Sequence, residues 1–243
     1  MSGLPDKIIS FDKKLFFCPE DRLIKFEDNV PSDQSWLIEI ADSFKGEGKL
    51  QVEGLLHIQE GAEVKIVIVS FSSRDGSVSI EADLKCGSRV ECSVASIADK
   101  AFKKVFDIKT IHNEGGSYSL TKMYGVLLDK AQLDFLGTSD IKKGAKKSWT
   151  RQEGRIADFS SGGKGQVSPI LKIAEDDVKA SHGAALGKIP EDSLFYMMTR
   201  GLTKKQATGL MTIGYLKPVV NEISNIEKRD ELLDYVSEER FTK

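Results

Sequence analysis

The feature that most constrains this chain is a series of short segments in which apolar residues recur at every second position. Successive side chains of a β-strand point to opposite faces, so a period of two marks one buried face. Between Gly48 and Val94 the segments keep this parity: Leu50, Val52, Leu56 and Ile58; Val64, Ile66 and Ile68; Val78, Ile80, Ala82, Leu84 and Cys86; Val90, Cys92 and Val94. Glycine-containing turns separate them. The pattern predicts β-structure, with Leu171 and Ile173 in its last strand.

Many short strands without intervening helices are compatible with three architectures, namely a sandwich, a barrel and a β-solenoid. Glycine-punctuated segments of similar size favour the solenoid, whereas the lack of a crisp sequence repeat argues against it. The alternation alone leaves all three open.

The chain changes character at both ends. Before residue 45, Pro5, Pro19 and Pro31 interrupt an irregular sequence, which predicts a capping segment. After Lys188 the apolar spacing becomes helical, and Pro190 favours a helix start there. We therefore expect an N-terminal cap over residues 1–45, a β core over 46–180 and a C-terminal helical subdomain over 181–243.

Signals inside the C-terminal region divide it into helices. Gly201 fits the end of a first helix, and Thr203 fits the N-cap of a second. Pro218 ends or kinks that second helix. Residues 219–235 are then expected to form a third helix.

Composition excludes several classes of protein. The 243 residues include 35 basic and 37 acidic ones, so no electrostatic bias toward nucleic acid or an anionic membrane follows. The first residues, MSGLPDKIISFDKK, lack the apolar core of a signal peptide. No apolar run has the roughly 20 residues that a membrane helix needs. The expected location is the cytoplasm.

Three common catalytic motifs are missing. The sequence has no GxxxxGK[ST] loop for binding ATP, no CxxC pair and no GxSxG nucleophile elbow. We expect that the chain does not itself hydrolyse ATP through such a loop.

Three stretches together resemble a known family. Residues 176–189 read DDVKASHGAALGKI, residues 194–202 read LFYMMTRGL, and residues 110–156 read TIHNEGGSYSLTKMYGVLLDKAQLDFLGTSDIKKGAKKSWTRQEGRI. Their order and spacing resemble the SufB/SufD family of iron–sulfur cluster assembly proteins. Gln152 and Pro169 also stand where that family usually has Gln and Pro.

The resemblance implies a right-handed parallel β-helix core with a C-terminal helical subdomain. It also implies a non-catalytic scaffold that pairs through its last β-helix strands and binds a SufC-like ABC ATPase through its helices. The pair would be a homodimer or a heterodimer with a SufB-like paralogue. A transient iron–sulfur cluster would form at the interface, with none bound tightly by the isolated chain.

His182 matches the family histidine at the subunit interface, which the resemblance links to cluster assembly. Imidazole is a ligand that suits iron. The alternative is a structural histidine that caps the last strand. Asp176 and Asp177 precede it, and neighbours on a strand face opposite ways, so the two cannot form an acid–base dyad. One of them is a candidate oxygen ligand, and the alternative is a turn or helix-entry carboxylate.

This chain departs from the family at three places. Ala180 stands where the SufD branch has a cysteine, and Gly183 stands where the SufB branch has an acidic residue. Residues 160–162, Ser-Ser-Gly, stand near a cysteine of the SufB branch. Because thiolates are the preferred ligands of iron–sulfur centres, these departures favour a SufD-like role or a minimal single-scaffold role.

The remaining cysteines and histidines are expected to be structural. Cys86 and Cys92 are in phase with apolar strand residues, so both should point into the core, and Cys18 is also expected to be buried. His112 is in phase with the core and should be buried and hydrogen-bonded. His57 is out of phase and should be exposed.

Two other functions remain open. A β-helix carbohydrate-active enzyme would need Asp, Arg and Lys aligned in a groove on one outer face. A structural assembly subunit would pair and bind the ATPase without contacting a cluster.

Overall fold

The computed structural model describes residues 11–17, 23–43 and 48–241. Its strands are β1 (Lys13–Phe17), β2 (Leu23–Val30), β3 (Ser35–Asp42), β4 (Lys49–Ile58), β5 (Glu63–Ser70), β6 (Asp75–Leu84), β7 (Arg89–Ala98), β8 (Lys103–His112), β9 (Tyr118–Leu127), β10 (Gln132–Ile141), β11 (Trp149–Asp158), β12 (Lys164–Ile173) and β13 (Lys179–Lys188). The helices are α1 (Glu191–Thr199), α2 (Lys204–Val220) and α3 (Ile226–Asp234), followed by the π-helical turn η1 (Tyr235–Arg240).

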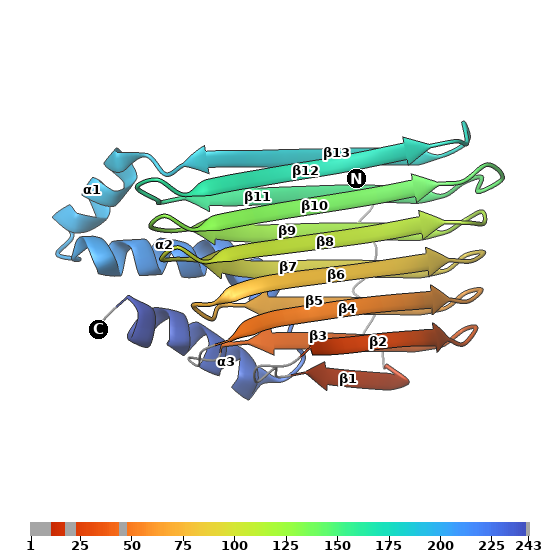
Figure 1. Cartoon of the computed structure of the whole chain (residues 1–243), viewed down its shortest axis with the longest axis horizontal. Helices are drawn as coiled ribbons and strands as arrows, with labels where there is room; N and C mark the ends of the chain where they lie inside the picture. The colour runs from red at the N-terminus through yellow and green to blue at the C-terminus, as the bar shows by residue number, and fades with distance from the viewer. Residues whose placement is uncertain (1–10, 18–22, 44–47, 242–243) are drawn as a thin grey trace.

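The strands form a parallel β-solenoid with two faces (Figure 1). Odd-numbered strands make a seven-stranded sheet and even-numbered strands a six-stranded sheet. Each turn of the solenoid, here called a rung, adds one strand to each sheet. Neighbouring strands within each sheet are parallel. The alternation at the level of sequence therefore corresponds to a solenoid, and the sandwich and the barrel are excluded.

The core between the sheets is formed by the apolar residues that recur at every second position of the sequence. In β4, for example, Leu50, Val52, Gly54, Leu56 and Ile58 are buried while the residues that alternate with them face outward. In-register neighbours from successive rungs stack on one another, as Ile66 does on Ile38. Burial of these columns is the main favourable contribution to the stability of the fold.

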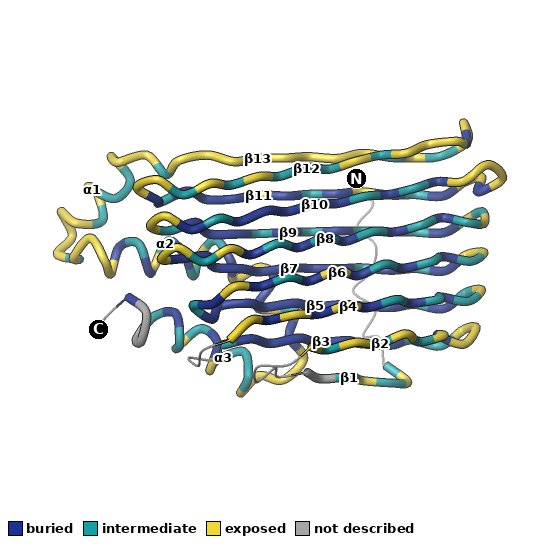
Figure 2. Tube along the Cα trace, viewed as in Figure 1, coloured by how far each residue is buried: buried dark blue, intermediate teal, exposed yellow. Residues whose placement is uncertain are grey.

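A second apolar layer lies outside the seven-stranded sheet. Residues Val67, Val69, Ala95 and Ile97 face outward yet are fully buried. They pack against residues that run from the end of α2 to the position after η1, namely Leu216, Val219, Val220, Ile223, Leu232, Val236 and Phe241. Figure 2 shows that β3, β5 and β7 are buried along much of their length. Much of the helical region is thus packed on the solenoid, while α1 has no buried residue.

The expected irregular N-terminal cap is wrong for the part of it that is described, because β1, β2 and β3 lie in residues 1–45 and belong to the sheets. β3 lacks alternation because both of its faces are covered, so its buried residues run continuously from Trp36 to Asp42. In β2 apolar and polar residues do alternate in part. The pattern is weak because Leu23 is exposed and because Asp28 and Asn29 are both polar.

The last strand also differs from the expected one. It is β13, paired in register with β11 from Trp149↔Lys179 to Asp158↔Lys188. Glycine and alanine dominate this segment, and their low β propensity hides the strand. The helices therefore begin at Glu191, after the strand that contains His182.

The helix signals are confirmed in part. Gly201 has φ +91° after α1, and Thr203 caps α2 with a reciprocal bond to Gln206. α2 continues two residues past Pro218. The expected third helix over 219–235 is wrong in its first part, because residues 221–225 form a corner and α3 starts at Ile226. No helix in the described part of the chain is long and apolar enough to cross a bilayer.

Candidate functional site at the open end of the solenoid

The solenoid has an open end, defined here as the end formed by β12 and β13. Both are edge strands, and in the part of the chain that the structure describes no further rung follows either one. Ile173 and Leu186 stand in register with the buried Ile141 and Ile156 of the preceding rung. Each is nevertheless 48% exposed. The interior of the solenoid therefore reaches solvent at this end.

His182 lies on the inward face of β13. Its register column runs from Cys92 through Thr121 and Gln152 to His182, and the first three of these residues are buried. His182 itself is exposed because nothing stacks on it. The imidazole is thus directed by the fold to the mouth of the interior, in the last rung, rather than to the outer face.

Gln152 closes the interior directly below His182. Its amide nitrogen Nε2 donates to Ser139 Oγ at 2.7 Å and to the carbonyl oxygen of Ile170 at 3.2 Å. Gln152 is on β11, whereas Ser139 and Ile170 are on β10 and β12 of the other sheet. This side chain therefore ties the two sheets together at the open end.

Behind Gln152 the interior is polar. Ser139 Oγ is bonded to Thr150 Oγ1 at 2.8 Å and to Thr110 Oγ1 at 3.1 Å. Thr150 is bonded in turn to Ser119 Oγ at 2.7 Å. We call this set the polar network: Thr110, His112, Ser117, Ser119, Ser139, Ser148, Thr150 and Gln152.

His112, at the end of β8, is a member of the polar network and is fully buried, as predicted. Its Nδ1 is 2.8 Å from Ser117 Oγ and its Nε2 is 2.8 Å from Ser119 Oγ. Burial lowers the pKa of His112 from 6.5 to about 4. A neutral imidazole donates through one nitrogen and accepts through the other, which matches two hydroxyl partners.

Asp176 and Asp177 are exposed in the turn between β12 and β13. They are not on a strand, so the argument from alternating strand faces does not apply to them. The neighbouring Glu175 shapes this turn: its carboxylate accepts from the Gly144 backbone N–H at 3.0 Å, and this bond is the main cause of a lowered Glu175 pKa. A role for Asp176 or Asp177 as an oxygen ligand stays a prediction.

The cysteine predictions have different outcomes. Cys92 is buried, and burial, followed by the nearby Glu222 charge, raises the pKa of its thiol to about 12. Cys86 is exposed, contrary to the prediction, because β6 ends at Leu84 and the chain then turns at Gly87 with φ +63°. The alternation of β6 therefore does not extend to Cys86. Cys18 lies outside the described residues.

His57 faces outward on β4, as predicted. Its Nδ1 is 3.1 Å from the carboxylate of Asp83, and its Nε2 is 3.7 Å from that of Glu27. Within residues 11–17, 23–43 and 48–241, no group of three or more His, Cys, Asp or Glu side chains could hold a metal ion.

A second exposed feature is the apolar surface of α1 and the first half of α2. Phe195 is 67% exposed and Tyr196 56% exposed, and Met198 and Leu210 are also exposed. A shallow groove between the helices is lined by Asp192, Ser193, Tyr196, Met197 and Met211.

Most members of the polar network were missed by sequence reasoning, which singled out only His112 and, by its likeness to a family position, Gln152. The sequence signal that could have found the others is their position along the strands. Ser119, Ser139 and Thr150 all occupy inward positions where the earlier rungs have apolar residues.

Comparisons with known proteins identify relatives. A family model described as the SufBD core domain of SUF-system FeS cluster assembly matches residues 51–215. SufD of Bacillus subtilis is 39% identical over 118 residues, which are 49% of this chain and 27% of that protein. An iron–sulfur cluster assembly SufBD family protein of Pyrococcus horikoshii is 41% identical over 58 residues, 24% of this chain and 13% of the relative.

A plant relative is also similar. The chloroplastic protein ABCI7 of Arabidopsis thaliana is 30% identical over 125 residues, 51% of this chain and 26% of that protein. The matched region thus spans about a quarter or less of the length of each of these relatives.

Proposed function

Because the chain belongs to the SufBD family of SUF-system iron–sulfur cluster assembly proteins, we propose that it is a non-enzymatic scaffold subunit of such an assembly complex. In this proposal it pairs with a second SufBD-family chain through its open end, presents His182 at the seam, and docks a SufC-like ABC ATPase on its helices. The complex would act in the cytoplasm.

The observation that carries the pairing is the uncovered interior at the open end. Ile173 and Leu186 belong to columns that are fully buried one rung earlier. Edge strands also carry backbone N–H and C=O groups that a second chain can pair with. A second solenoid that abuts β12 and β13 would cover both the apolar columns and the unpaired edges.

The nascent cluster would be cargo held at that seam. His182 is an inward-facing imidazole in the last rung, so it would point toward the interface between paired solenoids. Iron–sulfur clusters take thiolate ligands preferentially. Ala180 stands in place of a thiol two residues before His182, so we assign the thiolate ligands to the partner chain.

The docking of the ATPase is supported by the exposed aromatic residues of α1. Phe195 and Tyr196 are more exposed than buried, and aromatic residues often dominate binding energy at protein interfaces. An ATPase partner would also supply the hydrolytic activity for which this sequence has no P-loop.

The test is anaerobic reconstitution of the assembled complex with ferrous iron and sulfide. His182→Ala should lower the cluster content, read from iron and sulfide per complex, by about tenfold, in line with the loss of a metal-site residue. His57→Ala is the matched control, because His57 faces outward and should leave the content unchanged. Wild-type content in the His182→Ala complex would overturn the assignment and favour a structural subunit without cluster contact.

A further inference from the structure

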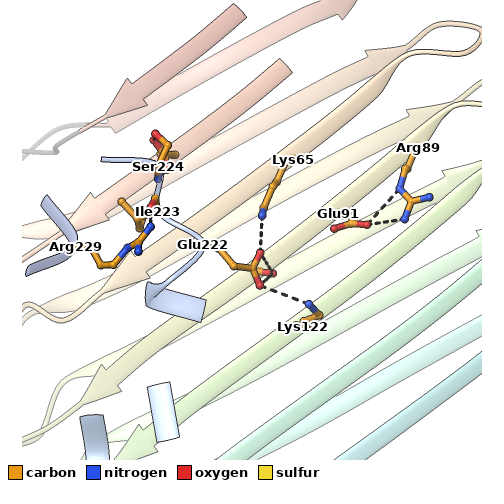
Figure 3. Close-up of polar contacts among 10 residues, drawn as sticks. Lys65, Arg89, Glu91, Lys122, Glu222, Ile223, Ser224 and Arg229 are labelled. Atoms are coloured by element: carbon orange, nitrogen blue, oxygen red, sulfur yellow. Dashed lines mark hydrogen bonds and ion pairs between the residues drawn. The ribbon is translucent and has the colours of Figure 1, made fainter. Parts of the chain in front are cut away.

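The corner between α2 and α3, residues 221–225, makes an unusual set of polar contacts with the seven-stranded sheet. The carboxylate of Glu222 accepts from Ser93 Oγ at 3.1 Å. It lies 3.1 Å from Lys65 Nζ and 3.5 Å from Lys122 Nζ. Figure 3 shows Glu222 between the two lysines. One side chain of the helical tail therefore contacts β5, β7 and β9 at once.

A second contact extends the corner to β3. Glu39 accepts from the backbone N–H of Ser224 at 2.5 Å and from its hydroxyl at 2.7 Å. Arg229 closes the corner from α3 by donating to the carbonyl oxygen of Ile223 at 2.6 Å (Figure 3). Together these bonds join the corner to four consecutive strands of the sheet, β3, β5, β7 and β9.

The polar contacts fix the position of the helical tail along the sheet, whereas the apolar layer does not. Val219, Val220 and Ile223 hold the tail against the sheet, but apolar attraction is non-directional and permits small sliding movements of packed elements. Charged and hydrogen-bonded contacts have defined partners. They therefore fix the position along the sheet at which the tail rests.

The contacts of Glu222 can also be exchanged. In the register, Lys65 is the neighbour of Glu91, and Lys122 is the neighbour of Glu153. If Glu222 withdraws, each lysine still has a carboxylate one strand away, and these carboxylates also pair with Arg89 and Arg155. Lys65 and Lys122 are 31% and 32% exposed, so water also reaches them. Breaking a buried ion pair is costly because it leaves a buried charge without a partner. Release of Glu222 would leave no such charge.

We propose that Glu222 is a releasable electrostatic latch that sets the position of the helical tail on the β-solenoid. The chain is covalently joined to β13 before α1 and is held at the corner after α2. The α1 and α2 surface between these attachments is the one assigned to the ATPase. A partner that displaces α1 and α2 would act on the latch at one end and on β13, which carries His182, at the other. This regulatory role rests on the proposed function.

The latch itself is tested on the isolated chain by amide hydrogen exchange. Glu222→Gln keeps the size of the side chain and removes the charge. It should accelerate exchange at residues 221–225 by about two- to fivefold, the range expected for solvent-accessible ion pairs. Glu231→Gln is the matched control, because Glu231 pairs with Lys228 of its own helix and with no other described cation. Equal exchange in the two variants would overturn the proposal.

A double-mutant cycle provides a second readout. Lys65→Met should accelerate exchange at the corner less than Glu222→Gln does, because Ser93 and Lys122 remain. The two changes should be less than additive when combined, since they remove the same contact. Additive effects would show that Lys65 and Glu222 act independently, which contradicts the latch.

Adding the ATPase separates this proposal from the proposed function. If the ATPase binds and accelerates exchange at residues 221–225 of the wild-type chain, both stand. If it binds while Glu222→Gln behaves like Glu231→Gln, docking stands and the latch fails. If it does not bind while Glu222→Gln accelerates exchange, the latch stands and the docking assignment fails.

Discussion

Gln152 and His182 are register partners on the inward faces of β11 and β13, yet Gln152 is 2% exposed and His182 is open to solvent. The two side chains differ in exposure because the next rung covers Gln152, whereas His182 lies in the last rung. A buried amide that spans both sheets thus supports an accessible imidazole at the mouth of the solenoid.

Replacing Gln152 should destabilise the open end. Gln152→Met keeps the volume but leaves Ser139 and the Ile170 carbonyl without their amide donor. A lost buried hydrogen bond of this kind costs about 1–3 kcal/mol in the free energy of unfolding. Urea denaturation would measure it. Gln166→Met is the control: Gln166 is exposed on β12, and its replacement should change stability by less than about 0.5 kcal/mol.

His112 should make stability depend on pH. Its pKa is about 4 in the folded chain, and the value for an unperturbed histidine is 6.5. Between these values the unfolded chain binds a proton that the folded chain does not bind, so stability falls as the pH falls through this window. The full loss is on the order of 3 kcal/mol.

The measurement is the urea midpoint at pH 7 and pH 5. The drop in the midpoint should shrink in His112→Asn and persist in His57→Asn, because His57 is outward-facing and half-exposed. An identical drop in the wild type and in His112→Asn would show that other groups cause the acid sensitivity.

Two glycines test the packing of the interior. A Cβ at Gly125 would lie 2.5 Å from Leu133 Cδ2 and 2.9 Å from the Phe135 ring, whereas a Cβ at Gly183 would meet no atom within 4 Å. Gly125→Ala should therefore cost about 1–3 kcal/mol through overpacking. Gly183→Ala should be nearly neutral in the isolated chain. Thermal unfolding of both variants compares them directly, and equal melting temperatures would contradict the packing.

The assigned docking surface predicts a selective loss of ATPase binding. Phe195→Arg should weaken binding of a SufC-like ATPase by about tenfold or more, as for an aromatic residue central to an interface. Ile226→Arg is a matched control, since Ile226 is 66% exposed and Phe195 is 67% exposed. Titration calorimetry would measure both, and similar affinities would place the ATPase elsewhere.

The rungs were predictable wherever one face of a strand meets solvent. Val52 on β4 and Ile80 on β6 follow the period of two and are buried as expected, and the residues beside them face outward. β3 was missed because helices and sheet cover its two faces, and β13 because glycine and alanine carry little strand signal. Cys86 shows the limit of parity, which gives the direction of a side chain only while the strand continues.

The site was only partly predictable for a similar reason. His182 was found through its likeness to a family motif, and its inward direction became clear only from the register with Gln152. Glu222 was not singled out, because its partners lie far away in the sequence, at Lys65, Ser93 and Lys122. No local pattern encodes contacts between a corner and distant strands.

The central claim is that the open end is the pairing surface, and sedimentation velocity of Leu186→Arg tests it most directly. Leu186 and Leu23 are both 48% exposed on edge strands, β13 and β2, at opposite ends of the solenoid. The account predicts that the wild-type chain and Leu23→Arg sediment as pairs, alone or with a SufB-like paralogue, and that Leu186→Arg does not pair. Pairs that persist in Leu186→Arg, or that are lost only in Leu23→Arg, would contradict it.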